Sequence, residues 1–221
     1  MRRAKRAFER AAESGSGPTR NEALPVRWPG AARKFPLFGE VMLVGILVVV
    51  VSLPIITLPL ALAAGVRHVR RFLASDDARL SLFWADIRYG FGAKLLFGLA
   101  VLGLAVVLLL DLDLAGTGAL PGGALVAVVG WVGLAALALV VLGYAGAWAP
   151  GMTGRTAIRV GIASLRADLV GAAYLLSAAG FTVIVTWQLA PLIMPALGCV
   201  ALAIVAIPER RPAQSTVQAL R

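Results

Sequence analysis

Apolar residues gather in five blocks, and every charged residue lies outside them, in the stretches before, between and after the blocks. The blocks are Val41–Val66, Leu95–Leu110, Gly122–Ala149, Leu169–Leu189 and Leu192–Ile207. No charged residue occurs between Leu114 and Gly154, or between Leu169 and Pro208. Each of these two stretches is about twice the roughly 20 residues that one membrane-spanning helix needs. The pattern therefore predicts an all-α, polytopic bundle of transmembrane helices.

The first apolar block is interrupted by Pro54 and Pro59, within the stretch SLPIITLPLALAAGVRHVRRF (residues 52–72). Each proline lacks a backbone donor and disfavours helical geometry in the residue before it. The pattern predicts a first arm over residues 38–51, a break at Ser52–Pro59, and a second arm through His68 to about Leu73. As one straight helix the block would span roughly 39 Å, too little for two crossings of a ~30 Å core. The element is therefore either a re-entrant turn or one kinked span.

Lysine and arginine fall into four groups along the chain. Nine precede Phe35, six lie in Arg67–Lys94, three lie in Arg155–Arg166, and three lie at the C-terminus. The loops around Asp111–Gly123 and Trp187–Pro191 hold none. Because cytoplasmic loops carry an excess of Lys and Arg, all four groups and both termini are expected in the cytosol. That arrangement favours the re-entrant form, since the first block would then return to the side from which it entered.

Three segments follow from this distribution. Residues 1–36 are a basic, flexible cytosolic tail, residues 37–208 form the transmembrane helical domain, and residues 209–221 form a short cytosolic C-terminal tail. The net charge of +10 is spread between the apolar blocks and not over one soluble face. This argues against nucleic acid as a partner and favours the lipid bilayer, with anionic headgroups at the basic segments. Arg155, Arg159 and Arg166 recur at near-helical spacing and predict an amphipathic helix on the membrane surface.

Candidate chemistry is sparse. His68, the single histidine, allows no two-histidine metal site within this chain, and its arginine neighbours predict a solvated, interfacial side chain. Ser75, followed by Asp76 and Asp77, predicts a helix N-terminus with Ser75 as its cap. No ionisable residue falls in the middle of an apolar block, which counts against a proton-coupled transporter. With no Walker or dinucleotide motif either, no cofactor and no enzymatic activity are predicted.

Three features in succession resemble a known family. They are LPIITLPLALAA (53–64), the basic stretch that follows it, and the aromatic LFWADIRYGF (82–91) leading into the next helix. In this order they resemble the YesL-like family of bacterial integral membrane proteins, a domain of unknown function. The resemblance covers about residues 35–110 by motif, and the rest by the number and spacing of apolar blocks. Members of that family are often encoded beside binding-protein-dependent sugar uptake systems. The resemblance implies an accessory role near a carbohydrate ABC-type importer in the bacterial plasma membrane.

Two functions follow as the main hypotheses. In the first, the chain is an accessory protein that docks on another membrane complex, such as importer subunits, through a cytosolic surface. The candidate docking residues are Arg67, Arg70, Arg71, Phe83, Trp84, Asp86 and Arg88, of which Asp86 and Arg88 are otherwise expected to face water or to pair locally. In the second, it is a small transporter or channel. Its binding site would lie at the break, at Ser52, Pro54, Thr57 and Pro59. A membrane-embedded enzyme is the least favoured hypothesis, because no general acid/base pair lies in reach of lipid.

Overall fold

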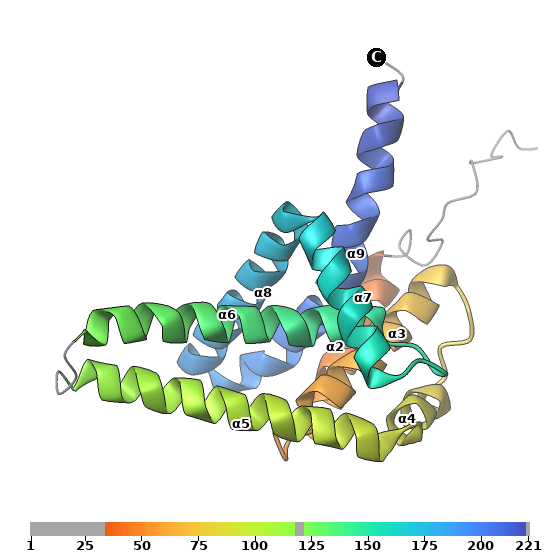
Figure 1. The fold of residues 1–221 in the computed structure, drawn as a ribbon. Coiled ribbons are helices and arrows are strands. Elements are labelled where there is room, and N and C mark those ends of the chain that lie inside the picture. The colour runs from red at the N-terminus through yellow and green to blue at the C-terminus, as the bar shows by residue number, and fades with distance from the viewer. Residues whose placement is uncertain (1–33, 118–121, 220–221) are drawn as a thin grey trace, which may run out of the picture.

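The computed structural model describes residues 34–117 and 122–219, and within them all regular structure is helical (Figure 1). This confirms the predicted all-α fold. Most of the predicted N-terminal tail, residues 1–33, lies outside the described residues. Its last three residues, 34–36, belong to the first described helix, which begins at Lys34. The helices are α2 (Lys34–Val51), α3 (Leu58–Ala74), α4 (Leu80–Arg88), α5 (Phe91–Gly116), α6 (Gly123–Ala147), α7 (Gly154–Ala167), α8 (Leu169–Gln188), the short 3₁₀ turn η2 (Ala190–Leu192) and α9 (Ile193–Ala219).

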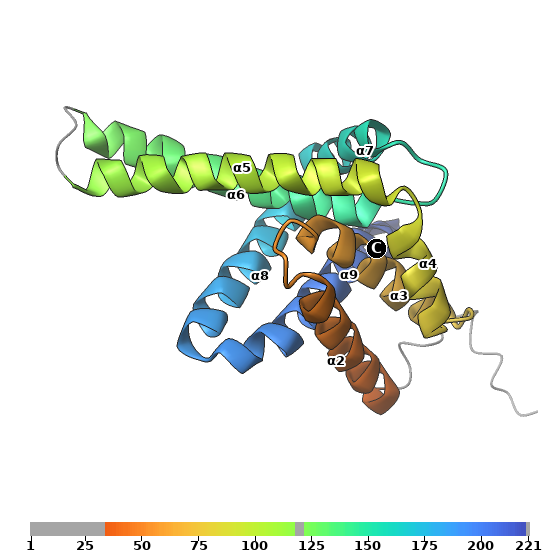
Figure 2. The same ribbon diagram turned by 90° about the horizontal axis from the view of Figure 1, so that it is seen from below.

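Four stretches of the described chain are long and apolar enough to cross a membrane, which makes this a membrane protein. They are Phe91–Gly116, Gly123–Ala147, Leu169–Gln188 and Ala190–Pro208. Helices α5 and α6 lie side by side and project beyond the rest of the molecule in both views (Figures 1 and 2). Helix α5 continues to Gly116, so the loop predicted from Asp111 onward is shorter than expected. Helix α9 likewise continues to Ala219, into the segment predicted as a tail.

The first apolar block is broken as predicted, and its two arms fold back on each other. The Thr57 hydroxyl donates to the Val51 carbonyl at the turn, and His68 pairs with Glu40 at the open end. Between these two contacts, Gly65 of α3 lies against side chains of α2. The order of the contacts makes α2 and α3 an antiparallel hairpin, which rules out one kinked span.

The tip of the α2–α3 hairpin reaches only part of the way along α5. A Cβ atom on Gly98 would overlap the Ile56 carbonyl oxygen, so the tip touches α5 at that residue. Gly98 lies seven residues after Phe91, about 10 Å along the helix at 1.5 Å per residue. The hairpin tip therefore meets α5 near its beginning, 18 residues before that helix ends at Gly116.

Helix α3 lies at the centre of the bundle, and its neighbours approach closely through small residues. Leu60, Ala61, Ala63 and Val66 have no exposed surface. A Cβ atom on Gly45 of α2 would overlap a carbonyl oxygen of α9 at Met194, and one on Gly198 would overlap the Val41 carbonyl. Small residues allow such close backbone approach, which is the main source of helix association in lipid.

The predicted surface helix is present as α7. Thr153 caps its first turn by accepting the backbone N–H of Thr156. Its inner face is buried where Gly161 crosses Gly143 of α6, and its three arginines are exposed. The amphipathic pattern is therefore confirmed as a helix that covers the charged end of the bundle.

The predicted helix start at Ser75 is wrong. Ser75 instead ends α3 in the left-handed conformation, with φ of 58°, and its N–H bonds back to the last turn. Helix α4 begins at Leu80, so Asp76 and Asp77 lie in the connection between the two helices. The error arises because Ser before acids is typical of a helix start, whereas the apolar stripe of α3 continues up to Leu73.

Candidate functional site

Helix α4 divides the residues predicted for docking between two faces. Phe83 and Asp86 point inward and are buried together with Ile87. Trp84 is 42% exposed, and Arg88, one turn further along, is exposed as well. Of the seven predicted docking residues, only Trp84 and Arg88 are exposed; the three arginines of α3 are partly covered. The exposed face of α4 therefore contains two of the seven residues of the predicted docking surface.

Asp86 joins α4 to α3 through two arginines. Its Oδ2 atom accepts from Arg67 Nε at 3.2 Å and from Arg71 Nη2 at 2.7 Å. Asp86 is 4% exposed and pairs with side chains 19 and 15 positions earlier, so the prediction that it faces water or pairs locally is wrong. A largely buried carboxylate shared by two guanidinium groups forms charge-assisted hydrogen bonds, which fix the packing of α4 on α3.

Lys94 and Trp148 complete this cluster from α5 and from the end of α6. Lys94 Nζ donates to the backbone oxygen of Asp86, and it lies 3.6 Å from the centroid of the Trp148 ring. The Arg67 guanidinium lies 5.6 Å from the same ring. The Trp148 ring and Lys94 are buried, and the Arg67 side chain is only 21% exposed, so both cation–π contacts are largely shielded from water, where they contribute most. We define Arg67, Arg71, Asp86, Lys94 and Trp148 as the polar cluster.

His68 is fully buried, so the prediction of a solvated side chain is wrong. Its Nε2 atom pairs with the Glu40 carboxylate of α2, and its ring meets the Phe83 ring edge-on at 6.4 Å. The imidazole is buried because α3 folds back along α2 and brings a carboxylate to it. Glu40 is the only charged residue between Lys34 and Arg67, and that isolation is the signal that could have pointed to it.

At the break, where the transporter hypothesis places its binding site, several polar groups are bonded within the turn, while the buried Ser52 hydroxyl has no hydrogen-bond partner among the described residues. The Thr57 hydroxyl donates to the Val51 carbonyl. Backbone N–H groups of the turn donate to carbonyls of the same turn; the Ile55 N–H, for example, donates to the Ser52 oxygen at 2.7 Å. The tip presents apolar Leu53 outward, with 76% of its surface exposed. Pro54 is also exposed, whereas Thr57 and Pro59 are buried. The four predicted residues of the break therefore differ in exposure.

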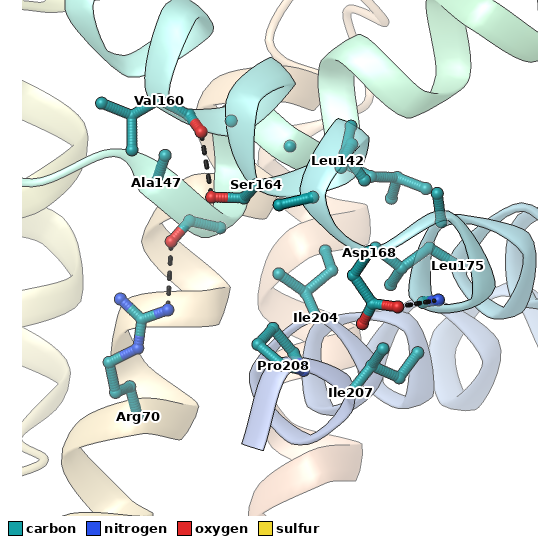
Figure 3. Close-up of a pocket in the computed structure, with 17 residues that line it drawn as sticks. Arg70, Leu142, Ala147, Val160, Ser164, Asp168, Leu175, Ile204, Ile207 and Pro208 are labelled. Carbon is teal, nitrogen blue, oxygen red and sulfur yellow. Dashed lines mark hydrogen bonds between the residues drawn. The ribbon is translucent and has the colours of Figure 1, made fainter. Parts of the chain in front are cut away.

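The cavities between the described helices include two that bear on ligand binding. One, of about 440 Å³, is partly enclosed and is lined by α6, α7, α8 and α9 beneath the surface helix (Figure 3). The other, of about 590 Å³, is almost wholly apolar and lies between α3, α5, α6, α8 and α9. Neither cavity is lined by any of the four residues predicted at the break. Among the described residues, no three His, Cys, Asp or Glu side chains come together as metal ligands would.

Comparison of the chain with protein-family models, with curated proteins and with solved structures found no match. The function proposed for the protein therefore rests on its own surfaces and on the resemblance of its motifs.

Proposed function

We propose that the protein is a non-catalytic accessory protein of the membrane, which docks on another membrane protein through the outward face of α4. The observation that carries this proposal is the pairing of an exposed tryptophan with an exposed arginine, Trp84 and Arg88, one turn apart on a single helix. Tryptophan and arginine are the residue types most enriched where binding energy concentrates in interfaces.

The rigidity of α4 supports this role. Its inner face is fixed by the bonds of Asp86 to two arginines and by the contact of Lys94 with the helix backbone. The Trp84 ring also packs edge-on against the buried Phe83 ring at 5.6 Å. Binding loses less conformational entropy when the contact residues are already held in place, so a fixed helix favours affinity.

The partner in this proposal is a subunit of a carbohydrate ABC-type importer in the bacterial plasma membrane. This part follows from the resemblance to the YesL-like family. It also requires α4 to face the cytosol together with both termini, as the positions of the basic segments predict. Helices α3, α4 and α7 all lie away from the turn between α5 and α6, in keeping with that orientation (Figure 1).

Co-purification tests the proposal. The tagged full-length protein is extracted from its native membranes in mild detergent, and bound proteins are identified by mass spectrometry. We expect an importer subunit to co-purify and to be reduced about tenfold by Trp84→Ala, because such contacts contribute at least about 1–2 kcal/mol. Trp131→Ala is the matched control, since Trp131 is 66% exposed but lies on α6.

Two results would contradict the proposal. One is the absence of importer subunits from the wild-type sample, or their equal loss in the Trp84 and Trp131 variants. The other is uptake of sugar or ions by vesicles that contain this chain alone, which would establish the transporter hypothesis instead.

A further inference from the structure

The cavity beneath α7 combines an apolar floor with a polar rim (Figure 3). Its floor is built from apolar side chains of three helices: Leu142, Leu175, Ile204 and Ile207. Its rim carries the Arg70 guanidinium, the Ser164 hydroxyl and the Asp168 carboxylate. A space of this composition fits an amphipathic molecule better than an ion or a purely apolar one.

Glycine residues create this space. Gly143 and Gly146 of α6, Gly161 of α7 and Gly171 of α8 all line the cavity. Helices α6 and α7 cross in backbone contact at Gly143 and Gly161, so no large side chain extends from the crossing into the space below. The cavity is therefore a consequence of the same close helix approach that holds α7 in position.

The cavity lies at the level where the membrane should end. It is bounded by the last two turns of α6, the first two turns of α8 and the last apolar residues of α9 before Pro208. The amphipathic helix α7 covers it from the charged side. A molecule bound there would have its apolar part among helix ends in the hydrocarbon and its polar part at the headgroup level.

The charge at this level is positive. Arg70 reaches the rim from α3, where its Nη2 atom donates to the Gly146 carbonyl at 3.0 Å. Arg159 and Arg166 are exposed on α7 nearby, and Asp168 is the carboxylate of the rim. The Asp168 Oδ1 atom accepts the Gly171 N–H at 2.8 Å as the cap of α8. Among the described residues around the cavity, cationic side chains therefore outnumber carboxylates, but Arg70 and Asp168 are the two charged residues that line it.

We propose that this cavity binds one anionic glycerophospholipid of the adjoining leaflet. The phosphate lies at Arg70 on the rim, and an acyl chain lies on the apolar floor. Basic pockets between transmembrane helices at the membrane boundary commonly hold anionic headgroups. At about 440 Å³ the cavity falls within the range of roughly 300–1,000 Å³ seen for ligand sites. This inference does not depend on the role proposed for α4.

Lipid titration followed by native mass spectrometry tests the site. The full chain is delipidated in detergent and titrated with phosphatidylglycerol, with zwitterionic phosphatidylcholine as the comparison lipid. We expect Arg70→Gln to weaken phosphatidylglycerol binding about tenfold, because the variant loses a charge-assisted hydrogen bond to the phosphate. Arg159→Gln removes the same charge at a position that does not line the cavity, and it should change the affinity less than twofold.

A second variant tests the apolar part of the site without touching its charge. Ala147 lines the cavity from the end of α6 and is only half-buried, so Ala147→Leu should fill space without preventing folding. We expect it to weaken phosphatidylglycerol binding at least fivefold while the melting temperature is unchanged. If Arg70→Gln does not fold, the Ala147→Leu variant alone tests whether the lipid occupies the cavity.

Three outcomes would overturn the proposal. Equal weakening by Arg70→Gln and Arg159→Gln would show that only general surface charge attracts the lipid. Full competition by millimolar inorganic phosphate would show that the rim binds phosphate without the lipid. Unchanged binding in Ala147→Leu would show that the acyl chain does not occupy the cavity.

Discussion

The first half of α3, from Pro59 to Val66, and the outer half of α5 are both apolar, yet their surroundings are opposite. Every residue from Pro59 to Val66 in α3 is buried, whereas Leu109 and Leu110 of α5 are more than half exposed. Hydropathy cannot distinguish them, because lipid is as apolar as a protein interior. The difference teaches that position in this bundle depends on small residues and on polar pairs, not on how apolar a helix is.

Two glycines, one in each region, show the same difference in packing. Gly45 of α2 touches the backbone of α9, and Gly103 of α5 has no other helix within 4 Å. Carboxylates follow the same division. Asp86 is held by two arginines in the polar cluster, while Asp113 is exposed near the end of α5. The packed half of the protein should therefore be sensitive to substitutions that the projecting hairpin tolerates.

The largest expected effect is on accessibility at the two ends of the protein. Ser75→Cys and Thr117→Cys are placed separately in a Cys199→Ser background, and intact cells are treated with a membrane-impermeant maleimide. We expect Thr117→Cys to be labelled and Ser75→Cys to be protected until the membrane is permeabilised, because basic segments remain in the cytosol. Labelling of both, or of Ser75→Cys alone, would contradict the proposed orientation.

The next largest effect is expected at the contact of α2 with α9. Gly45→Leu places a side chain where the Met194 carbonyl already lies, and backbone cannot yield as a side chain can. We expect about 3 kcal/mol of lost stability, measured by unfolding in mixed micelles of increasing SDS content. Gly103→Leu is the control, expected to change stability by less than about 0.5 kcal/mol. Equal loss in both variants would show that α5 is as closely packed as α2.

A smaller effect is expected in the polar cluster. Asp86→Ala removes the acceptor of two partly covered arginines, and we expect a loss of about 2 kcal/mol in the same unfolding measurement. Asp113→Ala removes a carboxylate from the exposed end of α5 and should have little effect. If Asp86→Ala also leaves stability unchanged, Asp86 does not hold α4 on α3.

Much of the fold could be predicted from the sequence because its determinants are local. Pro54 and Pro59 break a helix through the chemistry of their own rings, and the apolar blocks are long enough to indicate spans by themselves. The two arms of the first block were predicted within a few residues of α2 and α3. The predicted return of the second arm depended on the distribution of arginines, which is a property of the whole chain.

The polar contacts could not be predicted, because they join residues far apart in the sequence. His68 was expected in water on account of its neighbours in the chain, but its partner is Glu40, 28 positions earlier. Lys94 and Trp148 gave no local sign that they would meet. The seven predicted docking residues do not form one surface, because the burial of Phe83 and the pairing of Asp86 with α3 separate these two from Trp84 and Arg88.

The contact of α2 with α9 has a consequence for biosynthesis. The first described helix to leave the ribosome finds its closest partner in the last one, through Gly45 and Gly198. The α2–α3 hairpin therefore lacks its contact with α9 while about 120 further residues are synthesised, counted from Ala74 to Met194. Nascent chains that stop before α9 should leave that hairpin without its main neighbour and expose it to membrane quality control.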